Sequence, residues 1–116
     1  MSLTPEDRHQ LLRHFPTMLA RWRGGNAFLY SYCMSLSGVL KLRVVRKGVH
    51  GNLEIACGGL QTIRASERWD DSNIEIDVRD NGSRIPDFVV RDEKGGLEIV
   101  CDGVDIAENV KPIWPD

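Results

Sequence analysis

Two glutamates and two cysteines occupy equivalent positions in a stretch that the chain contains twice. Residues 51–60 read GNLEIACGGL and residues 95–104 read GGLEIVCDGV, and six of the ten positions are identical. Glu54 therefore corresponds to Glu98, and Cys57 to Cys101. Two carboxylates that converge can serve as acid and base if their surroundings separate their pKa values. Two thiols that meet can form a redox couple or a soft-metal site.

The alternation within the repeated stretch favours a simpler interpretation of all four residues. The cysteines continue the apolar face of a strand with period two, and a free cysteine in such a position behaves as a small buried hydrophobe. We therefore expect Cys57 and Cys101 in the core. The glutamates lie on the opposite face, where we expect them to meet solvent and to pair across strands with Lys41, Arg43 or Arg91.

A tryptophan followed by two aspartates lies in the longest predicted connection, residues 66–72, between the two copies. Connecting loops carry many binding residues, and tryptophan is enriched at interface hot spots. The alternative is that the tryptophan covers one end of a barrel while the aspartates begin a turn. The candidate binding residues are therefore Trp69, Asp70 and Asp71, together with Glu54 and Glu98.

Motifs of known enzymes and metal proteins are missing from the sequence. It has no Cys-x-x-Cys pair, no phosphate-binding glycine loop, no Gly-x-Ser-x-Gly and no His-Glu-x-x-His. No catalytic residue, metal or cofactor is therefore predicted. We expect a non-catalytic binding or protein-interaction module. The alternative is a small enzyme or small-molecule carrier with acidic residues in a barrel-mouth pocket.

Charge is unevenly distributed along the 116 residues, although the net charge is only −2. Residues 1–50 hold eight Lys/Arg against two acids, whereas residues 51–116 hold seven against fifteen. A basic face for a polyanion is one interpretation, and pairing of the two halves across the fold is the favoured one. Because the pI is about 5.9 and no reading motif occurs, a nucleic-acid partner is not expected.

Neither a membrane span nor a secretory signal is predicted. No run approaches the roughly 18 apolar residues of a spanning helix, and the N-terminus lacks a basic region followed by an apolar core. Three cysteines, an odd number, suit reduced thiols better than a disulfide framework. The sequence thus predicts one cytoplasmic domain over residues 1–116.

An N-terminal helix over 5–23 is the first element that would position these residues. Thr4 and Pro5 form a helix start, and an apolar stripe at helical spacing predicts packing on a sheet. Pro16 interrupts the pattern, which predicts a kink or two short helices at about 5–14 and 16–23.

Period-two patterns then predict two β repeats, 28–65 and 73–108, followed by an irregular tail over 109–116. Each repeat reads as a four-stranded meander whose last tight turn lies at Gly58–Gly59 or at Asp102–Gly103. The predicted fold class is α+β: the kinked helix packs on a mostly antiparallel, internally duplicated β-meander of about eight strands, barrel- or sandwich-like. Its edge strands would allow a homodimer.

Overall fold

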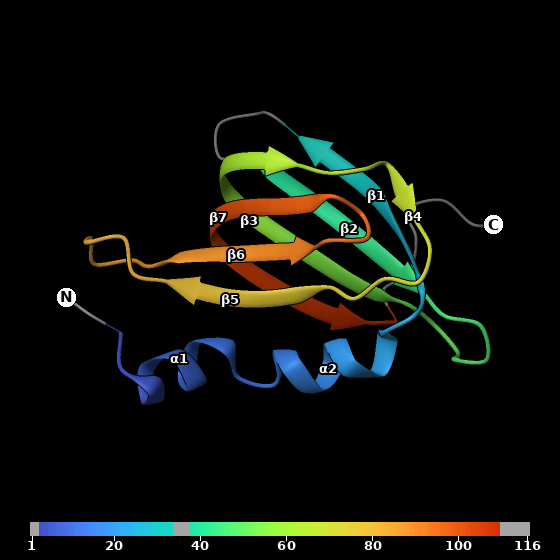
Figure 1. Ribbon diagram of the computed structural model, residues 1–116, viewed down its shortest axis with the longest axis horizontal. Coiled ribbons are helices and arrows are strands. Elements are labelled where there is room, and N and C mark those ends of the chain that lie inside the picture. Colours follow the sequence, from blue (N-terminus) through green and yellow to red (C-terminus); the bar gives the residue numbers. More distant parts are fainter. Residues whose placement is uncertain (1–2, 34–37, 110–116) are drawn as a thin grey trace.

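The computed structural model describes residues 3–33 and 38–109 and has an α+β fold, as predicted (Figure 1). Two short helices precede an antiparallel sheet, which has seven strands among the described residues. The predicted irregular tail over 109–116 lies outside the described ranges from residue 110 onward. The elements are α1 (Pro5–Leu12), α2 (Phe15–Trp22), β1 (Asn26–Cys33), β2 (Val39–Val45), β3 (Leu53–Arg64), β4 (Arg68–Trp69), β5 (Glu75–Arg79), β6 (Asp87–Asp92) and β7 (Leu97–Glu108).

The helical region divides where Pro16 predicted a break. At the start of α1, the Asp7 amide donates to the Thr4 hydroxyl over 3.0 Å and the Thr4 amide donates to the Asp7 carboxylate over 3.2 Å. This reciprocal capping box satisfies two helix-end donors. α1 ends at Leu12 and is followed by the capping residue Arg13, which has φ +49°. α2 begins at Phe15 with Pro16 in its first turn.

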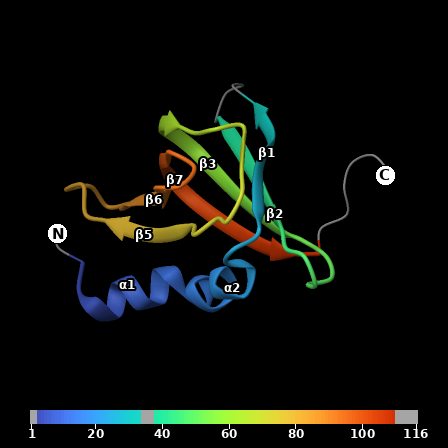
Figure 2. The same ribbon diagram turned by 45° about the vertical axis from the view of Figure 1, so that its right-hand side comes forward.

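The apolar stripe of the helices faces the core, as expected from its spacing. Phe15, Leu19 and Trp22 of α2 are buried. The Trp22 indole N–H also donates to the Glu108 carboxylate at the end of β7 over 3.0 Å. Both helices lie along β5 on one side of the sheet (Figures 1 and 2).

The sheet order is β4-β1-β2-β3-β7-β6-β5, so β3 and β7 pair at its centre. These two strands carry the two copies of the repeated stretch, and the copies pair with each other in antiparallel orientation. Cys57 lies opposite Val104, and Leu60 lies opposite Cys101. On either side of this pair runs a three-stranded meander, β1-β2-β3 on one side and β5-β6-β7 on the other.

The tight turns predicted at Gly58–Gly59 and Asp102–Gly103 are wrong. β3 and β7 continue through these positions without a turn. Gly58 lies opposite Gly103, and a register shift follows between Leu60 and Thr62. Glycine inside a strand often marks a bend or bulge, and it has that role here. Each meander therefore has three strands instead of four. The remaining strand, β4, lies outside both meanders at one edge of the sheet.

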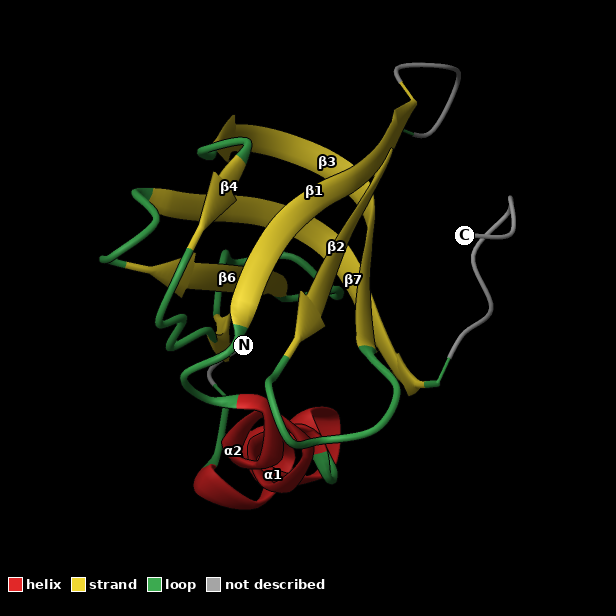
Figure 3. Ribbon diagram, turned by 90° about the vertical axis from the view of Figure 1, so that its right-hand side faces the viewer, coloured by secondary structure: helices red, strands yellow, loops and turns green. Residues whose placement is uncertain are grey.

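The sheet curls strongly around the core but is not closed into a barrel (Figure 3). Its two edge strands, β4 and β5, are joined by residues 70–74. Two backbone hydrogen bonds fix this connection to the start of β1. The Gly24 amide donates to the Ser72 carbonyl over 2.8 Å, and the Ser72 amide donates to the Gly25 carbonyl over 2.9 Å.

Ion pairs join the basic first half of the chain to the acidic second half, which is the arrangement that the sequence favoured. Arg8 pairs with Asp77, and Arg21 pairs with Glu108. Lys41 also pairs with Glu54, over 3.4 Å. The uneven charge along the sequence is therefore compensated in part within the fold.

Candidate functional site

Trp69, in the predicted connection over residues 66–72, is buried and stabilises this segment. Its indole N–H donates to the Asp92 carboxylate over 2.8 Å, and only 7% of the residue is exposed. The ring lies against Gly95, where an added Cβ would come within 2.4 Å of ring carbons. Trp69 therefore supports the loop from beneath instead of presenting a contact surface.

Asp92 fastens three chain segments through one carboxylate. Besides the indole, it accepts hydrogen bonds from the Asn73 amide over 2.7 Å and from the Lys94 amide over 3.0 Å. The residue is only 3% exposed, and a buried carboxylate is tolerated when donors surround it. We call this arrangement of Asp92, Trp69, Asn73 and Lys94 the Asp92 clamp. It ties the β4–β5 connection to the β6–β7 turn.

Asp70 and Asp71 project from the clamped loop and are both exposed. Asp71 adopts φ +51°, a conformation that aspartate tolerates better than most residues, and its carboxylate pairs with the Lys94 ammonium. Asp70 has no ion-pair partner in the part of the chain that the structure describes. The two aspartates are therefore displayed on a fixed backbone.

A cavity of about 460 Å³ lies beside this loop, between β5 and the β6–β7 turn. We call it the β5 groove, and it is lined by Asn73, Glu75, Arg91, Asp92, Glu93 and Lys94. A second cavity of about 260 Å³ shares Glu75 and Arg91 with it and reaches α2 at Pro16 and Leu19.

The charge of the β5 groove is set by its unpaired carboxylates. Both cations in its lining are engaged, because Arg91 lies 3.8 Å from Asp77 and Lys94 pairs with Asp71. Glu75 and Glu93 have no ion-pair partner within residues 3–33 and 38–109. These two glutamates favour the binding of cations in the groove.

Glu54 and Glu98 do not converge. They lie at the start of β3 and of β7, which run antiparallel, opposite Ala107 and Arg64. The two positions on β7 are separated by roughly 30 Å of strand at about 3.3 Å per residue. A shared acid–base site is therefore not formed by this pair.

Each of the two glutamates has its own cationic partner. Glu54 pairs with Lys41 at 3.4 Å and with Arg43 at 3.5 Å, as predicted. The expectation that it meets solvent is wrong, because only 7% of the residue is exposed; the two cations compensate its buried charge. The Arg43 guanidinium also lies 3.9 Å from the centre of the Tyr30 ring. Glu98 is half exposed and pairs with Arg64 at 3.3 Å, a partner that the sequence did not suggest.

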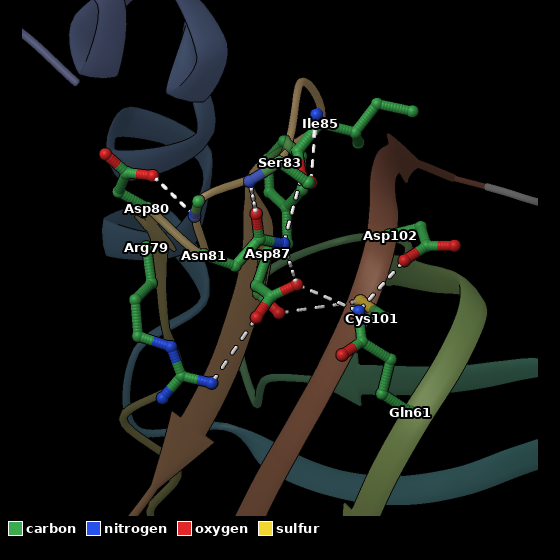
Figure 4. Close-up of polar contacts among 11 residues, drawn as sticks. Gln61, Arg79, Asp80, Asn81, Ser83, Ile85, Asp87, Cys101 and Asp102 are labelled. Carbon is green, nitrogen blue, oxygen red and sulfur yellow. Dashed lines mark hydrogen bonds and ion pairs between the residues drawn. The ribbon is translucent and has the colours of Figure 1, made fainter. Parts of the chain in front are cut away.

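A third buried carboxylate, Asp87, was not predicted as a site residue from the sequence. Figure 4 shows it between Arg79 and Gln61, near Asn81. The amides of Gln61 and Asn81 donate to it over 2.9 and 2.7 Å, and Arg79 lies 3.5 Å away. The hydrogen bonds from Gln61 and then Asn81 lower the pKa of Asp87 below its ordinary value. Because Asn81 lies in the β5–β6 loop and Gln61 lies at the bend of β3, Asp87 links these two segments. Gln61 also donates to Asp102.

Cys57 and Cys101 lie in the core, as predicted. Neither residue is exposed, and the Cys101 thiol lies 3.5 Å from the Gly103 carbonyl. A hydrogen bond with Cys101, together with burial, raises the pKa of the Cys57 thiol. The same hydrogen bond lowers the pKa of the Cys101 thiol. Neither thiol is exposed, and a buried structural cysteine is a poor nucleophile.

Within the described part of the chain, no cluster of three or more His, Cys, Asp or Glu side chains is arranged to hold a metal ion, and neither helix has the length and apolar character of a membrane span. The chain matched no protein-family model, no curated protein and no solved structure in the three comparisons that were made.

Proposed function

We propose that this protein is a non-catalytic interaction module that binds a cationic segment of a protein partner in the β5 groove. One observation carries the proposal: the Asp92 clamp orders a loop with two exposed aspartates next to a cavity-lining lysine, Lys94, and the cavity holds two glutamates without an ion-pair partner among the described residues. A preorganised site loses less conformational entropy on binding than a mobile one. Lysine or arginine side chains of a partner would complement Asp70, Glu75 and Glu93.

The state of the buried carboxylates supports a binding role over an acid–base one. A general acid or base works best with a pKa near the operating pH, which burial without donors can produce. Here each buried carboxylate is surrounded by donors or cations. Asp92 accepts three N–H groups, Asp87 has a lowered pKa, and Glu54 lies between two cations. These groups hold the fold together.

The enzyme or carrier alternative rests on acidic residues gathered at a barrel mouth. Glu54 and Glu98 lie far apart, and inward side chains such as Leu40, Leu42 and Ile55 fill the curl of the sheet. We therefore prefer the interaction module.

Three finer features belong to the same proposal. We infer that the chain is an internal duplication, because β3 and β7 have the same length at an offset of 44 residues and the meanders are arranged symmetrically about them. Beyond Leu29, β1 has no strand partner on its β4 side among the described residues, which leaves an edge where a homodimer could form. The reduced, buried thiols suit a cytoplasmic location.

Affinity capture with matched variants tests the proposed function. The groove variant carries Asp70→Asn and Glu93→Gln, and the control carries Glu6→Gln and Asp105→Asn, which remove two exposed carboxylates elsewhere. We expect a protein retained by the wild type and the control but reduced about tenfold or more by the groove variant, because two charge pairs at an interface are lost. The retained protein is then purified, and its binding is measured directly.

Two results would contradict the proposal. One is that every retained protein binds the groove variant as well as the wild type. The other is turnover of a small-molecule substrate that survives in the control and disappears when Glu54 or Glu98 is replaced by glutamine, since that result supports the enzyme alternative.

A further inference from the structure

A separate cavity of about 610 Å³ lies against the two helices, away from the β5 groove. Its volume is within the roughly 300–1,000 Å³ range of small-molecule sites. Four apolar residues contribute to its wall: Leu3, Pro5, Leu12 and Pro16. Leu12, at the end of α1, and Pro16, in the first turn of α2, both line it, so the cavity spans the break between the two helices.

The titratable side chains around this cavity are all basic. Arg8, His9 and Arg13 line it, and no carboxylate does so among the described residues. Arg8 and Leu12 are four residues apart and share one face of α1. His9 of α1 and Arg13, the residue after the helix, also line the cavity. Arg8 is anchored by Asp77 and by the Val78 carbonyl, whereas Arg13 has no ion pair within the described ranges.

Arg13 also holds a backbone conformation that favours glycine. Its φ is +49° and its ψ is −124°, a combination that is strained for a residue with a Cβ. Strained residues concentrate at functional sites, where the side chain repays the strain. Glycine would adopt this conformation with less strain. The position instead holds Arg13, an exposed cation that lines the cavity.

We propose that this cavity binds a small amphipathic carboxylate, with the apolar body against Leu12 and Pro16 and the carboxylate on the Arg13 guanidinium. Guanidinium groups bind carboxylates through two parallel hydrogen bonds. The first turn of α2 adds to the positive potential through its backbone N–H groups. The side chain of the capping residue, His14, makes no hydrogen bond to them.

Decanoate is a suitable probe, with decanol as the uncharged molecule of the same chain length. Decanoate is added below its micelle concentration to ¹⁵N-labelled protein, and backbone amide shifts are followed. We expect saturable shifts that centre on residues 8–17, and binding of decanol that is at least about tenfold weaker, because charge-assisted hydrogen bonds are among the stronger polar contacts.

Substitutions at Arg13 separate its charge from its effect on folding. Arg13→Gly removes the cation and relieves the backbone, so we expect decanoate binding to weaken about five- to tenfold while the Tm stays equal or rises. Arg13→Lys keeps a cation and should retain most of the affinity. Arg84→Gln, an exposed arginine on the β5–β6 loop, should bind like the wild type.

Three outcomes would overturn the inference. The first is decanol binding as tightly as decanoate, because an apolar groove without anion preference would then be sufficient. The second is unchanged decanoate affinity in Arg13→Gly. The third is shifts that are absent, or that centre on residues outside the helices.

Discussion

The Asp92 carboxylate accepts three N–H donors at 2.7–3.0 Å while only 3% of the residue is exposed. Asp92→Asn keeps one carbonyl oxygen and replaces the other with an NH₂ group that faces N–H donors. A hydrogen bond to a charged group contributes about 1.5–3 kcal/mol, and the variant loses at least one. With the donor–donor contact added, we expect the free energy of unfolding to fall by about 2–4 kcal/mol.

Urea unfolding at equilibrium measures this loss, provided that the m-value stays unchanged. Glu93→Gln is the control, because Glu93 is the next residue, is exposed and has no ion-pair partner among the described residues. It should change the free energy by no more than about 0.5 kcal/mol. The indole ¹⁵N–¹H resonance of Trp69 should move in Asp92→Asn, and the Asn73 amide should exchange faster with solvent.

A free energy for Asp92→Asn within about 0.5 kcal/mol of the wild type would refute the reasoning. So would a large loss of stability with the indole resonance unchanged, since the carboxylate would then act elsewhere. In either case the loop that carries Asp70 and Asp71 would not depend on the Asp92 clamp.

Three further predictions follow from the geometry. Gly95→Ala should lower the free energy of unfolding by about 1–3 kcal/mol, because its Cβ would come within 2.4 Å of the Trp69 indole ring. The control Gly58→Ala has open space and no positive φ, so it should lower the free energy of unfolding clearly less. Equal losses in the two variants would refute the contact between Gly95 and Trp69. Asp87 has a lowered pKa, so its contribution is present above its unfolded pKa of about 3.9 and is lost as pH falls through the folded value; Asp87→Asn should flatten the pH dependence of stability below about pH 4, which urea unfolding at several pH values would check. In a Cys33→Ser background, Cys57 and Cys101 should react with a maleimide only as the protein unfolds, and rapid labelling of the native protein would contradict their burial.

The helices could be predicted because their signals are local. Thr4, Pro5 and Pro16 act on the residues beside them, so the start of α1 and the break before α2 follow from the order of residues alone. The apolar stripe likewise indicated the face that packs on the core. No distant partner was needed for any of these predictions.

The glycine pairs were misinterpreted because their role depends on a distant strand. Gly58 lies opposite Gly103 across the β3–β7 pair, and the local sequence contains nothing about that partner. A glycine pair between two alternating runs suits a hairpin and suits a bend in one long strand equally well. Pairing between the two copies of the repeat decides in favour of the bend.

The same distinction separates the site residues that were found from those that were missed. Alternation indicated that Glu54 faces the cations of β2, and it pairs with Lys41 and Arg43. The partners of Asp87 and Asp92 come from other elements, such as Gln61 for the first and Trp69 for the second. Only the fold brings these groups together, so neither aspartate stood out in the sequence.

Binding of a cationic partner segment in the β5 groove is tested most directly by cross-linking without a spacer. A carbodiimide joins a carboxylate to a lysine amine in contact with it, and mass spectrometry identifies the residues joined. With the partner retained by affinity capture, we predict cross-links from its lysines to Asp70, Glu75 or Glu93. Cross-links confined to carboxylates elsewhere, such as Glu6, Asp80 or Asp105, would contradict the proposed site.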